Sequence, residues 1–118
     1  MKRLIAAVVF VLLTATPVFA VSDDGFELAK NWREYKNFYK GFDPASTLIK
    51  VDRVGEYRGF VKGVIDALDG IAFAIPKNVT RKDVYAIVGK YLDDHPKELK
   101  ESAVYLVIIA LSTAFPKK

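Results

Sequence analysis

Apolar residues recur at helical spacing along residues 54–71, and a second pattern of small residues lies beside them. The apolar positions are three or four residues apart, as on one face of an α-helix: Val54, Tyr57, Val61, Val64, Leu68 and Ile71. Gly55, Gly59, Gly63 and Ala67 recur every four residues and form a stripe with almost no side chains. Each interior glycine costs a helix roughly 1 kcal/mol relative to alanine. We therefore expect another helix to pack closely on this stripe and offset the loss.

Charged residues argue against insertion of this helix into a membrane. Small residues four apart also occur where membrane helices meet, but six charged residues interrupt the segment here: Asp52, Arg53, Glu56, Arg58, Lys62 and Asp66. Lipid does not tolerate such charges, so the helix is predicted to pack inside a globular domain. Asp66 is either a buried acceptor that ties helices together or a half-exposed residue, and the pattern does not separate the two.

Helices are also predicted on both sides of this segment. An aromatic stripe at helical spacing marks an earlier helix, which we interpret as core packing and not as a ligand platform: Leu28, Trp32, Tyr35 and Tyr39. Thr80 and Asp83 have the spacing of a capping box and begin a later helix. This helix is predicted to end at His95-Pro96, because a residue before proline is disfavoured in the helical region.

Residues 103–111 are all apolar, and this run has two interpretations. Its Val, Ile and Tyr content is typical of a buried strand, but its small and apolar residues keep helical spacing up to Ala114. We predict a helix that is buried on most sides and stops at Pro116, and an irregular segment at residues 71–79. The predicted fold class is all-α: a single small domain of about four helices around the glycine-rich helix.

The first twenty residues are typical of a secretory signal peptide. Lys2 and Arg3 precede an apolar run at residues 4–13, and Val18-Phe19-Ala20 has the small residues that signal peptidase reads. Cleavage is predicted after Ala20, which leaves residues 21–118 as the mature domain in the periplasm. The apolar run is too short to span a bilayer, which needs about 20 residues, so no membrane association is expected after removal of the signal.

Charge and composition exclude several classes of function. Without Lys2 and Arg3, the 18 basic residues become 16 against 14 acidic ones, a net charge of +2 with the signs interspersed. A nucleic-acid partner is not expected, because it needs a clustered basic surface. The chain has no cysteine and one histidine, and no catalytic motif built on serine occurs. We expect no enzyme activity, no catalytic or metal-binding residue and no cofactor, and His95 is interpreted as a helix-end residue.

Four segments between residues 57 and 116 carry a family resemblance: YRGFVKGVIDAL, FAIPKNVT, KYLDDHPKEL and SAVYLVIIALSTAFP. In this order they resemble the Rap/Tai family, the periplasmic immunity proteins of type VI secretion amidase effectors. The matching positions are Gly59, Gly63, Asp66, Ala67, Pro76, Val79, Thr80, Tyr91, Leu92, His95, Pro96, Ala114, Phe115 and Pro116. The chain departs from the family at Tyr57, Ala74 and Lys117, where members usually carry cysteines.

The resemblance implies a small helical protein that binds and blocks a peptidoglycan amidase delivered by a rival cell. The motifs mark no contact residues, and whether the chain forms a homodimer is left open. Since loops on a rigid frame often carry recognition, Phe73 in the irregular segment is our choice of partner-binding residue, with a core position as the equal alternative. The other function class is a small periplasmic helical chaperone of the acid-stress kind, which would expose apolar surface at low pH.

Overall fold

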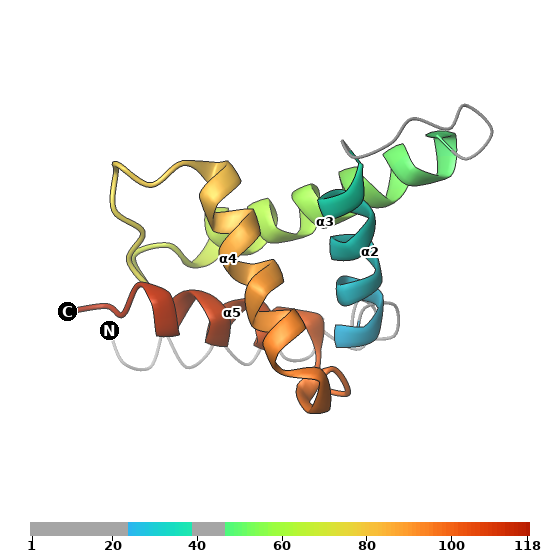
Figure 1. Ribbon diagram of the computed structural model, residues 1–118. Coiled ribbons are helices and arrows are strands. Elements are labelled where there is room, and N and C mark those ends of the chain that lie inside the picture. Colours follow the sequence, from blue (N-terminus) through green and yellow to red (C-terminus); the bar gives the residue numbers. More distant parts are fainter. Residues whose placement is uncertain (1–23, 39–46) are drawn as a thin grey trace, which may run out of the picture.

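The computed structural model describes residues 24–38 and 47–118, and in α3 it describes side chains from residue 51 onward. These residues form four α-helices, labelled in Figure 1: α2 (Gly25–Asn37), α3 (Thr47–Leu68), α4 (Arg81–Asp94) and α5 (Ala103–Ala114). A short 3-10 helix, η1 (Pro96–Glu98), joins α4 to α5. The predicted all-helical single domain is confirmed, and the apolar run at residues 103–111 is a helix. The predicted signal peptide, its cleavage after Ala20, and Tyr39 lie outside the described residues.

Side-chain caps begin three of the helices. Asp24 Oδ1 accepts the Glu27 N–H at 3.1 Å at the start of α2, and Ser102 Oγ accepts the Tyr105 N–H at the start of α5. The predicted capping box of α4 is confirmed, since Thr80 Oγ1 accepts the Asp83 N–H and Asp83 Oδ2 accepts the Thr80 N–H. These bonds satisfy backbone donors that a helix start otherwise leaves free.

The helix ends also follow the sequence signals. His95 is the C-cap of α4, in a non-helical conformation, and Pro96 opens η1, as the His95-Pro96 pair predicts. Gly70, just beyond α3, has φ +86°, a left-handed conformation that glycine adopts without strain. The chain therefore leaves α3 in a sharp turn.

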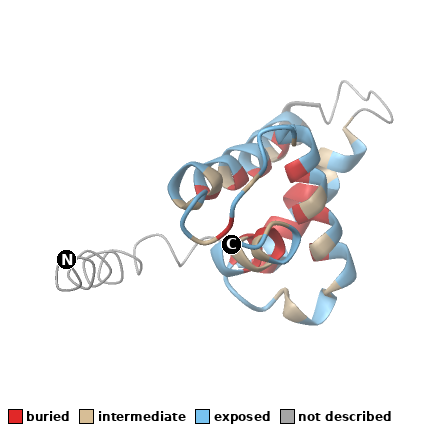
Figure 2. Ribbon diagram, turned by 90° about the vertical axis from the view of Figure 1, so that its left-hand side faces the viewer, coloured by how far each residue is buried: buried red, intermediate tan, exposed pale blue. Residues whose placement is uncertain are grey.

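Helices α2 and α5 each pack against the three other helices. In Figure 1, α3 runs across the upper part of the molecule and α5 lies below it, with α4 crossing both in this view and α2 to the right of α4. Buried residues line the helix faces that point toward one another (Figure 2). The largest fully buried side chains come from α3, α4, α5 and the segment after α3: Tyr57, Phe73, Leu106, Leu111, Val61, Val88 and Val107.

An aromatic cluster joins α2, α3 and α4. The Tyr57 ring lies 5.5 Å from Trp32, 5.3 Å from Tyr35 and 6.2 Å from Tyr85 between centroids. The Tyr57 hydroxyl donates to the Tyr85 carbonyl oxygen at 2.6 Å, and burial raises its pKa well above the ordinary tyrosine value. The ring and hydroxyl of Tyr57 therefore connect α3 to both α2 and α4.

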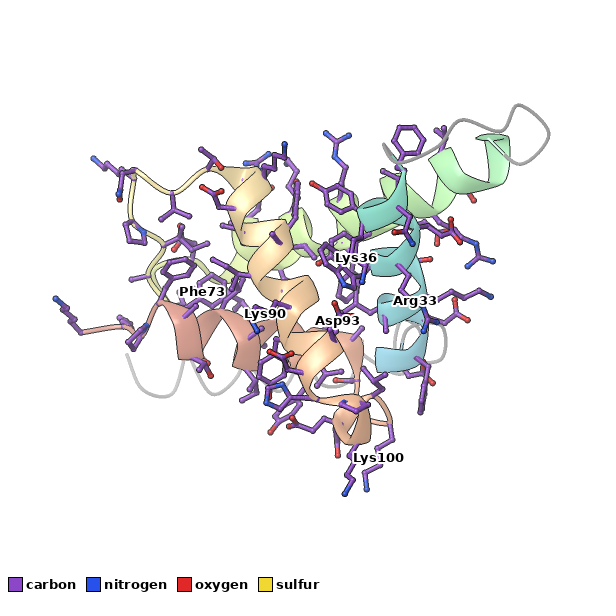
Figure 3. All side chains as sticks on the ribbon, viewed as in Figure 1. Arg33, Lys36, Phe73, Lys90, Asp93 and Lys100 are labelled. Atoms are coloured by element: carbon purple, nitrogen blue, oxygen red, sulfur yellow. The ribbon has the colours of Figure 1, made fainter. Side chains whose placement is uncertain are left out.

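Trp32 of α2 packs directly on Gly89 of α4. A Cβ built on Gly89 would overlap the Trp32 ring, whose Nε1 donates to Asp93 Oδ2 on the same helix as Gly89 at 3.1 Å. Asp93 also pairs with Lys36 of α2 at 3.3 Å (Figure 3). Asp93 therefore links α2 to α4.

Phe73 belongs to the core. Its side chain has no exposed surface and lies on the inner side of the segment that follows α3 (Figure 3). Gly70 N–H donates to the Phe73 carbonyl oxygen at 2.7 Å, and Ala74 N–H donates to the Phe115 carbonyl oxygen at 3.0 Å. The segment is irregular, as predicted, but these bonds hold it against the end of α5. The hypothesis that Phe73 contacts a partner is therefore wrong, and the core alternative is right.

The burial of α5 differs from the prediction in one respect. Val104 and Tyr105 are about half-exposed, at 45% and 47% of their full surface, whereas Leu106 and Val107 are buried. The apolar run thus has one open side near its start.

Candidate functional site

The glycine stripe of α3 faces outward. Gly55, Gly59 and Gly63 are exposed, and a Cβ built on any of them would meet no atom within 4 Å. The expected close packing of a helix on this stripe is therefore wrong, because α2 packs beside the stripe and leaves it bare. The glycines that do permit close approach are Gly89, against Trp32, and Gly25, against Leu99 and Leu106.

A first hollow, which we call the α2–α3 hollow, lies on one side of the bare stripe. It has a volume of about 490 Å³ and combines apolar and polar lining residues: Leu28, Asn31, Gly55, Glu56, Gly59, Phe60 and Ala103. Two of its lining residues are glycines, so a bound chain could bring its backbone close to α3 here.

Asn31 is the only buried polar side chain among the described residues, at 6% exposure. Its Nδ2 donates to Glu56 Oε2 at 3.2 Å, and its Oδ1 is buried without a hydrogen-bond partner. Since the amide nitrogen is the donor and the amide oxygen an acceptor, the nitrogen faces the Glu56 carboxylate and the oxygen points away from it. A buried oxygen without a partner costs about 1–3 kcal/mol, so Asn31 holds an unsatisfied acceptor next to this hollow.

A second hollow, which we call the basic hollow, lies on the other side of the stripe, between α3 and the start of α4. Its volume is about 610 Å³, and it is lined by Tyr35, Gly55, Arg58, Gly59, Lys62, Arg81, Lys82 and Tyr85. No carboxylate is part of this lining in the described chain. Gly55 and Gly59 line both hollows, which makes the bare stripe a low ridge between them.

The Asp66 carboxylate offsets part of the positive charge that lines the basic hollow. It accepts a hydrogen bond from Lys62 at 2.7 Å, and this bond, helped by the charge of Arg81, lowers the pKa of Asp66. The Asp66 side chain is about half-exposed, so the half-exposed alternative of the sequence prediction is confirmed. Arg58 and Lys82 make no ion pair within 4 Å in the described part of the chain.

The other residues singled out by sequence stand at helix ends. Thr80 and Asp83 cap α4 and thereby fix the direction of Arg81 and Lys82 at the rim of the basic hollow. His95 lies at the opposite end of α4, where its ring stacks on Tyr91 at 3.9 Å between centroids. His95 and Pro96 therefore take no part in either hollow.

The sequence did not single out Asn31 or the four basic residues as a site. A polar residue three positions after Leu28, on the buried side of an amphipathic helix, is the signal that could have identified Asn31. Arg58 and Lys62 are four residues apart and share a helix face, but no pattern brings them next to Arg81 and Lys82.

The described residues show neither a metal centre nor a membrane span. Residues 24–38 and 47–118 contain no group of three or more histidine, cysteine, aspartate or glutamate side chains placed to hold a metal ion. Within the same residues, no helix is both long and apolar enough to cross a membrane. The exposed face of α3 instead offers groups suited to binding another molecule: the uncovered backbone at the glycines, the cations of the basic hollow and the unpaired Asn31 oxygen nearby.

A comparison with protein-family models matches residues 44–116 to the Rap1a immunity proteins. The chain belongs to the Rap1a immunity protein family. The match covers α3, α4 and α5, and therefore the glycine stripe and every cation of the basic hollow, whereas Asn31 and Trp32 of α2 lie before it. A search of curated proteins finds no match to this chain. Membership in the Rap1a family indicates a non-enzymatic protein that binds a secreted protein effector.

The open stripe makes a prediction about stability. Gly59→Ala is expected to raise the free energy of unfolding by about 0.5–1 kcal/mol, because alanine favours a helix interior and its methyl group meets no other atom. The melting temperature should rise by a few degrees, as measured by circular dichroism. Gly63→Ala should behave in the same way. A fall in melting temperature for both variants would show that the stripe is covered in solution.

Proposed function

We propose that this chain is exported to the periplasm and there binds a type VI secreted peptidoglycan amidase, which it blocks by covering the active cleft. Family membership carries this proposal, joined to the signal-like first twenty residues. The exposed α3 face supports it, because a bare helix with hollows on both sides suits close contact with another protein. A stable interface of this kind buries roughly 1,200–2,000 Å² in total.

Co-expression with a candidate amidase in the periplasm tests the proposal. The candidate is any cell-wall amidase found to be encoded beside this chain's gene, and the wild-type chain should prevent the lysis that such an amidase causes alone. The double variant Gly55→Gln/Gly59→Gln should lose protection, because two long side chains would cover the bare stripe between the hollows and block contact with the amidase. Glutamine is a good helix former, and a Cβ has room at both positions, so the fold should be kept.

Thr113→Gln/Ala114→Gln is the matched control, since both residues are exposed on α5, away from the α3 stripe. This control should protect as the wild type does. Equal protection by the two double variants would mean that the α3 face is not the interface. Absence of binding to any amidase, together with an ability to hold denatured proteins in solution at low pH, would instead support the chaperone class.

A further inference from the structure

The basic hollow carries a high local positive charge, although the net charge of the whole chain is small. After the predicted cleavage, the net charge is only +2, yet four cationic side chains from two helices line this one hollow: Arg58, Lys62, Arg81 and Lys82. Asp66 balances part of this charge through Lys62 and Arg81. Like charges gathered on one surface repel one another, which costs stability and favours an occupant of opposite sign.

The lining of the hollow favours carboxylates in particular. Arg58 and Lys82 are exposed and without ion pairs in the described chain, so their donors are free for an incoming group. A guanidinium presents planar donors that fit a carboxylate with two hydrogen bonds. Tyr35 and Tyr85, whose rings meet edge to face at 5.7 Å, supply an aromatic wall that can cover the apolar part of the same occupant.

The α2–α3 hollow adds a second condition on the occupant, namely a hydrogen-bond donor for Asn31. Asn31 Oδ1 is buried and unpaired beside the same two glycines that line the basic hollow. Because this oxygen is buried, a main-chain N–H reaches it only if the Asn31 side chain turns toward the hollow, and the missing side chains of Gly55 and Gly59 leave room for the donor chain. An extended segment lying across the stripe would meet both requirements.

We propose that the α3 face docks an extended acidic segment of the protein partner, whose carboxylates enter the basic hollow while a backbone N–H reaches Asn31 Oδ1. This inference rests on the proposed function for the identity of the partner. It adds the chemistry of the segment that the chain recognises. In this proposal the basic hollow attracts the acidic segment electrostatically, and the bond to Asn31 fixes which residue of the segment lies over the stripe.

Charge reversal tests the basic hollow. The variant Arg58→Glu/Lys82→Glu should weaken binding of the purified amidase at least about tenfold in calorimetry, because like charges then face each other across the interface. Wild-type affinity should fall between about 0.05 and 0.5 M NaCl, where screening increases strongly, and the variant should show a flatter dependence. Lys97→Glu/Lys100→Glu makes the same change of charge near η1, with Lys100 far from α3 (Figure 3), and should bind as the wild type does.

A peptide probe tests the site without the amidase. A short glutamate-rich peptide should shift the amide signals of Gly55 and Gly59 and the side-chain amide of Asn31 in nuclear magnetic resonance spectra. A lysine-rich peptide of equal length should leave them unchanged. Asn31→Leu, which removes the acceptor and keeps a similar volume, should bind the glutamate-rich peptide more weakly and keep the charge dependence.

The outcomes separate this inference from the proposed function. If the amidase is bound with the same affinity by wild type and Arg58→Glu/Lys82→Glu, the acidic-segment inference is overturned and the immunity function stands. If no amidase is bound, the immunity function fails and the peptide shifts alone decide the inference. Equal shifts from both peptides would overturn it. A dimer of this chain that Gly59→Gln dissociates would also overturn it, because a second copy would then occupy the face.

Discussion

Phe73→Ala is expected to lower the free energy of unfolding by about 3–5 kcal/mol, which is a large part of the stability of a small domain. Phe73 has no exposed surface and belongs to the core cluster to which all four helices contribute. Truncation would remove buried apolar area and leave a cavity in the core, and both effects lower stability. Chemical denaturation followed by circular dichroism measures the change.

Ile71→Ala is the matched control, because Ile71 lies in the same segment with 66% of its surface exposed. Its effect on the free energy of unfolding should stay within about 0.5 kcal/mol, as for most surface substitutions. If the two variants were equally stable, Phe73 would be outside the core in solution. Any measured loss of partner binding by Phe73→Ala should therefore be corrected for the fraction of the variant that is unfolded.

Gly89→Ala should also destabilise the domain, by about 1–3 kcal/mol or more, although alanine is the better helix former. The new methyl group would overlap the Trp32 ring. That ring cannot move freely, since it is hydrogen-bonded to Asp93 and stacked on Tyr35 at 5.8 Å between centroids. The melting temperature should fall by about 4–8 °C for each kcal/mol lost.

Trp32 is the one tryptophan of the chain, so its fluorescence reports directly on this contact. The emission of folded Gly89→Ala should differ from that of the wild type, because the ring or α4 must shift. Gly63→Ala is the matched control, with the same chemical change on a helix at an open position, and it should stabilise the domain and leave the emission unchanged. A melting temperature for Gly89→Ala at or above the wild-type value would contradict the contact.

The three glycines of α3 show why a small-residue pattern alone does not locate a helix contact. Their four-residue spacing correctly places them on one face, but spacing does not say what covers that face. Gly89 stands alone in its helix and has no such pattern, yet it makes the close approach. The difference depends on where α2 lies relative to α3 and α4, and only the packed structure decides this.

Phe73 shows the same limit for a loop. Between Gly70 and Pro76 every residue is apolar, and the sequence does not say which of Ile71 and Phe73 points inward. The backbone bonds from Gly70 to Phe73 and from Ala74 to Phe115 turn Phe73 into the core and Ile71 outward. The bond from Ala74 to Phe115 depends on the approach of the end of α5, which the sequence pattern does not place beside this segment.

Local patterns in the sequence by themselves determined the helices and their ends. Helical spacing, the Thr80–Asp83 capping box and the His95-Pro96 stop depend on neighbours within a few residues, which is why they could be predicted for this chain. The family resemblance could likewise be recognised from sequence alone, because its motifs are short segments in a fixed order along the chain. Only the tertiary structure decided that the glycine stripe is open, that Asn31 Oδ1 lacks a partner, and that cations from α3 and α4 share one hollow. These features arise between helices far apart in the chain, where packing of the whole core sets the distances.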